Sequence, residues 1–190
     1  MKLYLSIAIL LFISGCDIFQ TREPEKPITG RSSYTFPATP ELVVQNIANS
    51  LKEKNLQDYM SCFVDSAYSQ KSYRFIATPG ATARYSFFSK WTLKSEESYF
   101  NNVISKLSST EIIDISITKV TAEAISADSV QYIWQYSLQI PRKNASAMKY
   151  DGQMRFTMIP DNRSAWVIST WDDIKADNGS GWSDLKGENY

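Results

Sequence analysis

The sequence predicts an α+β fold in which N-terminal helices pack on a curved antiparallel meander sheet. Apolar residues recur at helical spacing between about residues 39 and 107, and from residue 111 their period changes to two. With 43% apolar and 13% aromatic residues, the chain of 190 residues can build a core, which argues against global disorder. Its length fits one domain once a leader and a linker are removed.

The first predicted helix begins at residues 39–41, Thr-Pro-Glu. These residues supply an N-cap, a proline at the first helical position and an acid in the first turn. The apolar side of this helix consists of Leu42, Val43, Ile47 and Leu51. Asn55 is placed to cap a second, short helix that runs to Phe63.

Residues 71–77 alternate as a short strand, and Thr78-Pro79-Gly80 predicts a turn after it. The aromatic segment 81–91 fits one helical turn that ends at Trp91. A third helix follows, capped by Thr92 or Ser95. Its apolar residues at helical spacing are Tyr99, Phe100, Val103, Ile104 and Leu107.

Alternate residues are apolar from residue 111 onward, as expected for strands with one buried and one polar face. The alternation covers 113–117, 130–140 and 148–158, and a last strand spans about 164–174. Residues 160–162, Pro-Asp-Asn, predict the turn before that last strand. Asp172 and Asp173 are adjacent in this strand, so they point to opposite faces, and we expect both to be solvated.

The first fifteen residues have the pattern of a secretion signal: Lys2, then an apolar run from Leu3 to Ile13, then small residues. The run is too short to cross a bilayer, which needs about twenty residues. Residues 13–16, Ile-Ser-Gly-Cys, resemble the bacterial lipobox. The resemblance implies a diacylglyceryl thioether on Cys16, cleavage before it, and acylation of the new amine by a chain such as palmitate.

Acyl chains on Cys16 would anchor the protein stably in a lipid bilayer, because each buried methylene contributes about 0.8 kcal/mol. Asp17 resembles the retention signal of Gram-negative lipoproteins, which implies the periplasmic face of the inner membrane in such a host. We therefore expect an extracytoplasmic protein, lipid-anchored at the cell membrane. The expected organisation is a signal peptide at 1–15, a lipidated tether at 16–38, a domain at 39–176 and a tail at 177–190, with one docked turn at 182–186.

The element order over residues 39–174 resembles the cone-shaped NTF2-like fold, also called cystatin-like. The resemblance rests on segments 39–41, 55–63 and 91–100, the last with the pattern W…E..YF, and it extends to a group of uncharacterised bacterial lipoproteins. The superfamily includes isomerases, epoxide hydrolases, dehydratases, transport adaptors and secretion components, so the fold alone does not select an activity. It implies a tapered cavity between the sheet and the helices, open at one end.

Nine aromatic residues are candidates to line this cavity, and the alternative is that they fill it as core. They are Tyr59, Phe63, Tyr73, Phe75, Trp91, Tyr99, Tyr132, Trp134 and Phe156. Aromatic residues at structural spacing are mostly packing residues, so of the two alternatives we favour the core.

The composition excludes several chemistries. The chain has no histidine, which removes Ser-His-Asp and Cys-His catalysis and most zinc sites. Once Cys16 is lipidated only Cys62 remains, so no intramolecular disulfide forms, and we expect Cys62 to be a small buried apolar residue. The chain has equal numbers of acidic and basic residues, so it lacks the excess of positive charge that is typical of a nucleic-acid binder. No metal or cofactor is expected.

The leading hypothesis is a non-catalytic binding or interaction module of the cell envelope, whose partner is a small apolar ligand or an envelope protein. The alternative is a small-molecule enzyme of the isomerase or hydratase type, which needs a buried carboxylate facing an open pocket. Asp65, Asp114 and Asp128 are the acids nearest the expected cavity wall, but nothing forces any of them inward. The outer face of the sheet is too polar for an obligate interface, so we expect a monomer.

Overall fold

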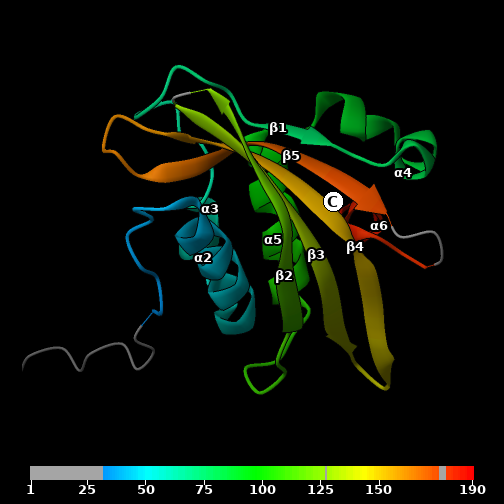
Figure 1. Cartoon of the computed structure of the whole chain (residues 1–190). Helices are drawn as coiled ribbons and strands as arrows, with labels where there is room; N and C mark the ends of the chain where they lie inside the picture. Colours follow the sequence, from blue (N-terminus) through cyan, green and yellow to red (C-terminus); the bar gives the residue numbers. More distant parts are fainter. Residues whose placement is uncertain (1–31, 127, 176–178) are drawn as a thin grey trace, which may run out of the picture. The chain divides into compact units, whose positions relative to one another are not determined.

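The computed structural model describes residues 32–126, 128–175 and 179–190 (Figure 1). The predicted signal peptide, Cys16 and most of the predicted tether therefore lie outside the described residues. Residues Ser32–Tyr190 form one compact unit. In this part of the chain, no helix is long and apolar enough to cross a membrane.

The described chain folds into helices and one five-stranded sheet. The helices are α2 (Pro40–Glu53), α3 (Leu56–Met60), α4 (Pro79–Arg84), the 3-10 helix η1 (Ser86–Lys90), α5 (Leu93–Ser105) and α6 (Trp182–Asn189). The strands are β1 (Arg74–Ile76), β2 (Asp114–Ser126), β3 (Ser129–Arg142), β4 (Ala145–Pro160) and β5 (Trp166–Lys175). The α+β architecture predicted from the sequence is thus confirmed.

The strands join in the order β1-β5-β4-β3-β2. Strands β2 to β5 form the predicted antiparallel meander, whereas β1 pairs in parallel with the last strand, β5. The sheet is curved, and α2, α3 and α5 lie against one side of it (Figure 1). Register shifts after Lys119, Ile140 and Thr157 mark bulges, which bend strands and support this curvature.

The predicted helix starts are confirmed at α2, α3 and α5. Thr39 precedes the proline that opens α2, although its side chain makes no capping hydrogen bond. The Asn55 side chain caps α3 by accepting the backbone N–H of Asp58 at 3.1 Å. Thr92 and Ser95 form a reciprocal capping box at the start of α5.

Residues 78–80 do not form the predicted turn but open α4, which is a correction to the sequence analysis. The Thr78 side chain caps α4 by accepting the backbone N–H of Ala81 at 3.3 Å, and Pro79 occupies the first helical position. Ala81 is completely buried, so the turn of helix is held by the core. This Thr-Pro start has the same physical basis as the start of α2.

The C-terminal segment differs from the expected tail after residue 176. Trp182–Asn189 forms an eight-residue helix, α6, rather than a single turn. Five consecutive residues, 182 to 186, are at most 1% exposed, so the first turn and a half of α6 is buried on every side. A surface helix buries one stripe only, whereas a helix buried all round lies inside a core. The helix α6 therefore occupies the space between the sheet and α5.

Candidate functional site

The centre of the helix–sheet interface is an ion pair between Glu96 of α5 and Lys186 of α6, which we call the buried pair. Neither side chain has any exposed surface, and the Lys186 Nζ lies 2.8 Å from each Glu96 carboxylate oxygen. Glu96 precedes Tyr99, Phe100 and Val103 by three, four and seven residues, so helical geometry places it on the buried side of α5. The helix therefore presents Glu96 on the same side as its core residues.

Three further donors reach the Glu96 carboxylate. The Tyr59 hydroxyl donates to Oε1 at 2.7 Å, while the Tyr73 hydroxyl and the Trp91 indole N–H donate to Oε2 at 2.9 and 2.8 Å. Burial, with the nearby Glu96 charge, raises the pKa of Tyr59 and of Tyr73 well above 10, so both hydroxyls keep their protons. The carboxylate is therefore fully hydrogen-bonded, which makes its burial tolerable.

The Lys186 ammonium lies in an aromatic cage. Its Nζ is 3.6 Å from the ring centre of Phe75 and 3.8 Å from that of Trp171, distances at which a cation is attracted to an aromatic face. Burial lowers the pKa of Lys186 from 10.5 to about 8, and the Glu96 charge opposes this shift. The ammonium is therefore held by one carboxylate and by aromatic rings.

A second carboxylate, Asp173 of β5, holds the first turn of α6. It accepts the Tyr136 hydroxyl at 2.9 Å, and the backbone N–H and hydroxyl of Ser183 at 2.7 and 2.6 Å. The two adjacent acids of β5 do point to opposite faces, but the expected solvation of Asp173 is wrong, because its side chain is buried against these donors. Asp172, on the other face, pairs with Arg155 at 3.0 Å and stays partly exposed. Burial raises the pKa of Asp173.

The remaining polar groups of the first turn of α6 are also paired. The Trp182 indole N–H donates to the Tyr99 hydroxyl at 2.9 Å. Asp184 forms an ion pair with Arg84 and accepts the backbone N–H of Gly181 at 2.8 Å. The first turn of α6 therefore fills the interior of the fold with matched side chains.

Most of the nine aromatic candidates lie in the core. They are Tyr59, Phe63, Tyr73, Phe75, Trp91, Tyr99, Tyr132, Trp134 and Phe156, of which eight are at most 9% exposed and one, Tyr132, is half-buried. Five of them contact the buried pair or α6 directly. Phe63 and Phe156 pack on Trp171, and Trp134 lies beside Tyr132 with ring centres 6.0 Å apart. Eight of the nine therefore belong to the core, and Tyr132 packs against it.

The three acids considered from the sequence lie elsewhere. Asp65, Asp114 and Asp128 are all exposed. Asp65 borders a hollow of about 510 Å³ between α3 and the start of α5, together with Glu97 and Arg163. Glu96, Asp173 and Lys186 were not among the predicted site residues, although the position of Glu96 on the apolar side of α5 was a signal for a buried charge.

Cys62 is buried and free, as predicted, and burial raises the pKa of its thiol. It is therefore a packing residue rather than a reactive thiol. Over residues 32–126, 128–175 and 179–190, no group of three or more acidic or cysteine side chains is arranged to hold a metal ion.

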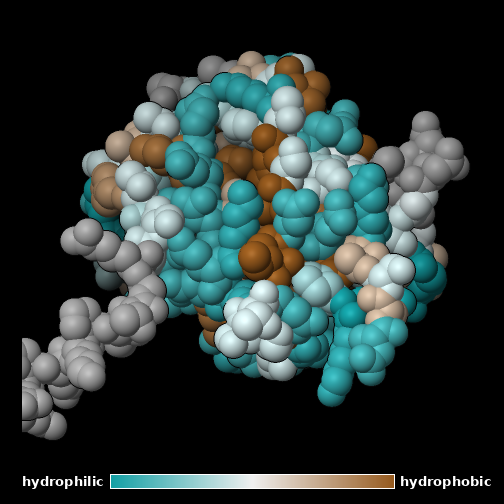
Figure 2. Space-filling model, turned by 90° about the horizontal axis from the view of Figure 1, so that it is seen from below, coloured by the Kyte–Doolittle hydropathy of each residue, from teal (hydrophilic) through white to brown (hydrophobic). Residues whose placement is uncertain are grey.

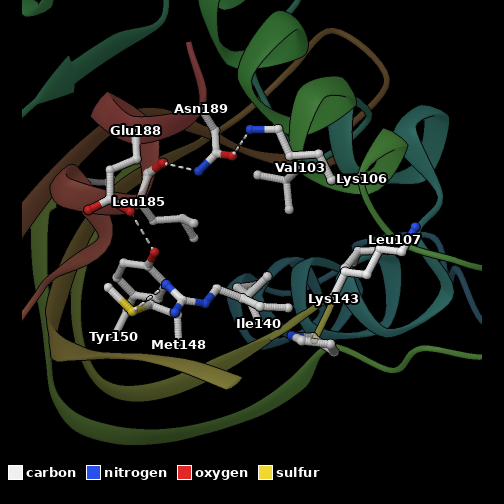
Figure 3. A pocket seen from close by; sticks show the side chains of 12 residues that line it. Val103, Lys106, Leu107, Ile140, Lys143, Met148, Tyr150, Leu185, Glu188 and Asn189 are labelled. Atoms are coloured by element: carbon white, nitrogen blue, oxygen red, sulfur yellow. Dashed lines mark hydrogen bonds between the residues drawn. The ribbon is translucent and has the colours of Figure 1, made fainter. Parts of the chain in front are cut away.

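A cleft of about 340 Å³ opens beside α6. It is formed by the end of α5, residues 185–189 of α6, and the adjoining ends of β3 and β4 (Figure 3). Its apolar lining includes Val103, Leu107, Ile140, Met148 and Leu185. Seen from below, hydrophobic side chains gather near the middle of a mainly hydrophilic face (Figure 2). The volume of the cleft, about 340 Å³, falls within the range of volumes found for small-molecule sites.

Charged side chains also line this cleft. They are Lys106, Arg142, Lys143 and Glu188. Glu188 accepts the Tyr150 hydroxyl at 2.7 Å, and burial together with this bond raises the pKa of Tyr150. The arrangement can bind a small molecule with an apolar part, whereas the buried pair has no free surface at which one could bind.

No protein-family model and no curated protein sequence matches the chain. Solved structures do match it. A proposed aromatic ring hydroxylase from Novosphingobium aromaticivorans is 12% identical with a TM-score of 0.58, over 77% of this chain and 92% of that one. A conserved protein from Planctomyces limnophilus is 11% identical with a TM-score of 0.55, over 72% of this chain and 94% of that one.

A ketosteroid isomerase-like protein from Erwinia carotovora atroseptica is 10% identical with a TM-score of 0.52, over 73% of this chain and 94% of that one. Matches at such low sequence identity indicate a shared fold but not a shared activity. Together with the curved sheet and its helices, they show that the chain has the NTF2-like cone fold.

Proposed function

We propose that the protein is a lipid-anchored, non-catalytic binding module of the cell envelope that takes a small ligand in the cleft between α5, α6 and the ends of β3 and β4. One observation carries the proposal. The first turn of α6 fills the interior of the cone, and the buried pair within it is completely enclosed. A ligand therefore has room in the cleft beside α6 rather than in the interior.

The environment of Glu96 supports binding over catalysis. A general base must come within hydrogen-bond distance of a substrate proton, and its pKa must lie near the working pH. Glu96 already accepts hydrogen bonds from Tyr59, Tyr73, Trp91 and Lys186. Both carboxylate oxygens are thus occupied by donors of the fold, and neither is open to a substrate proton.

A second candidate function is a small-molecule isomerase, which the types of residue around Glu96 suggest. Glu96 with the Tyr59 and Tyr73 hydroxyls is a carboxylate next to hydrogen-bond donors inside an apolar cone. This constellation could act on a substrate only if α6 withdrew and took Lys186 with it. Turnover by the intact protein that is lost in Glu96→Gln, with the fold retained, would favour this candidate over binding.

The anchor rests on the lipobox-like segment at residues 13–16, which lies outside the described residues. Metabolic labelling of a bacterial host with an alkyne analogue of palmitate tests it. We expect label and membrane association for the wild type and for Cys62→Ala, and neither for Cys16→Ser. Wild-type protein that is soluble and unlabelled would contradict the anchor.

The binding site is tested by methyl NMR of the full chain in phosphatidylcholine nanodiscs, titrated with an organic extract of the host envelope. We expect saturable shifts at Val103, Leu107 and Ile140, and none at Val43 on α2. Leu107→Trp, which fills the cleft, should abolish the shifts, while Ile112→Trp at a position 69% exposed and outside the cleft should preserve them. Saturating extract without shifts at the cleft methyls would contradict the proposal.

A further inference from the structure

We infer that the cleft selects a short, single-chain carboxylate. Its apolar tail enters between α5 and α6, and its anionic head lies at the cationic rim, which is formed by Lys106, Arg142 and Lys143. The inference rests on the proposed binding function and names the class of its ligand. It follows from the size of the cleft, from its apolar wall, and from the charges around its opening.

The size limits the ligand to one short chain. The cleft has about 340 Å³. One water occupies about 30 Å³ of liquid, so the cleft holds roughly eleven such volumes, or about ten non-hydrogen atoms. A membrane lipid with two long acyl chains is several times larger than this volume, so a whole lipid does not fit in the cleft.

The wall of the cleft suits a hydrocarbon tail. Leu185 and Val103 are almost completely buried, and Leu107 is half-buried on the other side of the opening. Ile140 and Met148, paired across β3 and β4, close the wall on the sheet side. A tail placed here removes its own apolar surface and that of Leu107 from water, which drives its entry.

Three cationic side chains, Lys106, Arg142 and Lys143, line this cleft, together with one carboxylate. That carboxylate, Glu188, already accepts the Tyr150 hydroxyl. None of the three cationic groups forms an ion pair with another residue of the described chain. The excess of positive charge favours an anionic head over a neutral head and disfavours an ammonium.

The present partners of these cations are weak or neutral, so an anion would improve on them. The Lys106 ammonium donates to the Asn189 amide oxygen at 2.7 Å, and the Arg142 guanidinium reaches only the Met148 sulfur at 3.7 Å. A carboxylate is a stronger acceptor than an amide or a thioether for either donor. Arginine can also bind a carboxylate through two parallel hydrogen bonds.

The test compares three probes that share an eight-carbon tail and differ in the head: octanoate, octyl glucoside and octyltrimethylammonium. Each is titrated below its micelle concentration into the full lipidated chain in phosphatidylcholine nanodiscs, with the Ile140 and Leu107 methyl shifts as readout. We expect octanoate to bind at least about tenfold more tightly than octyltrimethylammonium, with octyl glucoside between them.

Charge variants assign the selectivity to the rim. Arg142→Gln with Lys143→Gln should weaken octanoate binding by about tenfold and leave octyl glucoside binding unchanged. Lys71→Gln with Lys90→Gln removes the same charge from exposed positions outside the cleft and should change neither. Equal binding of the anionic and cationic probes, or octanoate binding that is insensitive to the rim variant, would overturn the inference.

The two proposals fail separately. If envelope extract shifts the cleft methyls but octanoate does not, the ligand class is wrong and the binding function stands. If neither the extract nor any probe shifts them, the cleft is not a ligand site and both proposals are overturned.

Discussion

Glu96 and Lys186 lie 90 residues apart in the sequence and meet as an ion pair with no exposed surface. This contact joins the last helix of the chain to the centre of the fold. Each partner is stabilised by the other and by aromatic side chains, so the pair fixes where α6 lies and how the cone is filled.

Glu96→Gln should lower the free energy of unfolding by about 3–5 kcal/mol, because it leaves the Lys186 ammonium buried without a counter-charge. The control is Glu97→Gln, one residue along α5, where a partly exposed carboxylate pairs with an exposed lysine. Its effect should stay within about 0.5 kcal/mol. Urea unfolding followed by tryptophan fluorescence measures both, and similar losses in the two variants would contradict a buried charge at position 96.

The lowered pKa of Lys186 predicts how stability depends on alkaline pH. Since the folded chain loses the Lys186 proton near pH 8 and the unfolded chain keeps it until about pH 10.5, the unfolded state binds more protons between these values. The free energy of unfolding should therefore rise with pH above about 8, by on the order of 1 kcal/mol per pH unit. It should stop rising near pH 10, where tyrosines of the unfolded chain begin to ionise.

Lys186→Met should remove this alkaline rise, whereas Lys90→Met, at an exposed position, should retain it. Denaturation at several pH values from about 7.5 to 9.5 measures the slope for each variant. A wild-type slope equal to that of Lys186→Met would mean that the amine titrates alike in the folded and unfolded chains.

Asp173→Asn should loosen α6. The change removes the negative charge that accepts hydrogen bonds from Tyr136 and Ser183. Weakening these buried hydrogen bonds should lower the free energy of unfolding by about 1–3 kcal/mol. Amide hydrogen exchange in residues 182–189 should become faster, because those amides depend on the first turn of the helix. Asp172→Asn, which affects only a partly exposed ion pair with Arg155, should leave that exchange unchanged. Unchanged protection in Asp173→Asn would argue that α6 is held without this carboxylate.

Two glycines on helices should respond in opposite ways to alanine. A Cβ atom at Gly187 of α6 would lie 2.3 Å from the Tyr85 ring, so Gly187→Ala should force the helix or the ring to move and destabilise the fold by about 1–3 kcal/mol. At Gly80 of α4 nothing lies within 4 Å of such an atom, and Gly80→Ala should stabilise the fold by about 0.5–1 kcal/mol. Thermal unfolding compares them. A gain in stability for Gly187→Ala would show that α6 is not packed against Tyr85.

The elements of the fold were predictable because each carries its own local signal. The strands alternate over 113–117, 130–140 and 148–158, and Asn55 and Thr92 cap the helices that they precede. The pairing of β1 with β5 joins residues far apart in the sequence, and no local spacing encodes it. At residues 78–80 the glycine favoured a turn, although Thr-Pro had already been interpreted as a helix start at residue 39.

The site was less predictable. Glu96 falls on the apolar side of α5, and Lys186 follows Trp182 by four residues, so each charge sits on a buried helical side. The sequence does not show that these two charges form an ion pair. A charged residue at such a position can also reach solvent if the helix rotates slightly about its axis. Only the packing of α6 inside the cone decides that both charges are buried and paired.

Lysine acetylation of the native protein, read by mass spectrometry, tests most directly whether α6 fills the cone. Acetylation requires the reagent to reach the amine, and Lys186 has no exposed surface whereas Lys90 is exposed. We predict that Lys90 is acetylated in the native protein while Lys186 stays unmodified until the chain is denatured. Acetylation of native Lys186 at the rate of Lys90 or faster would contradict a filled interior, and with it the proposal that the ligand site is the cleft beside α6.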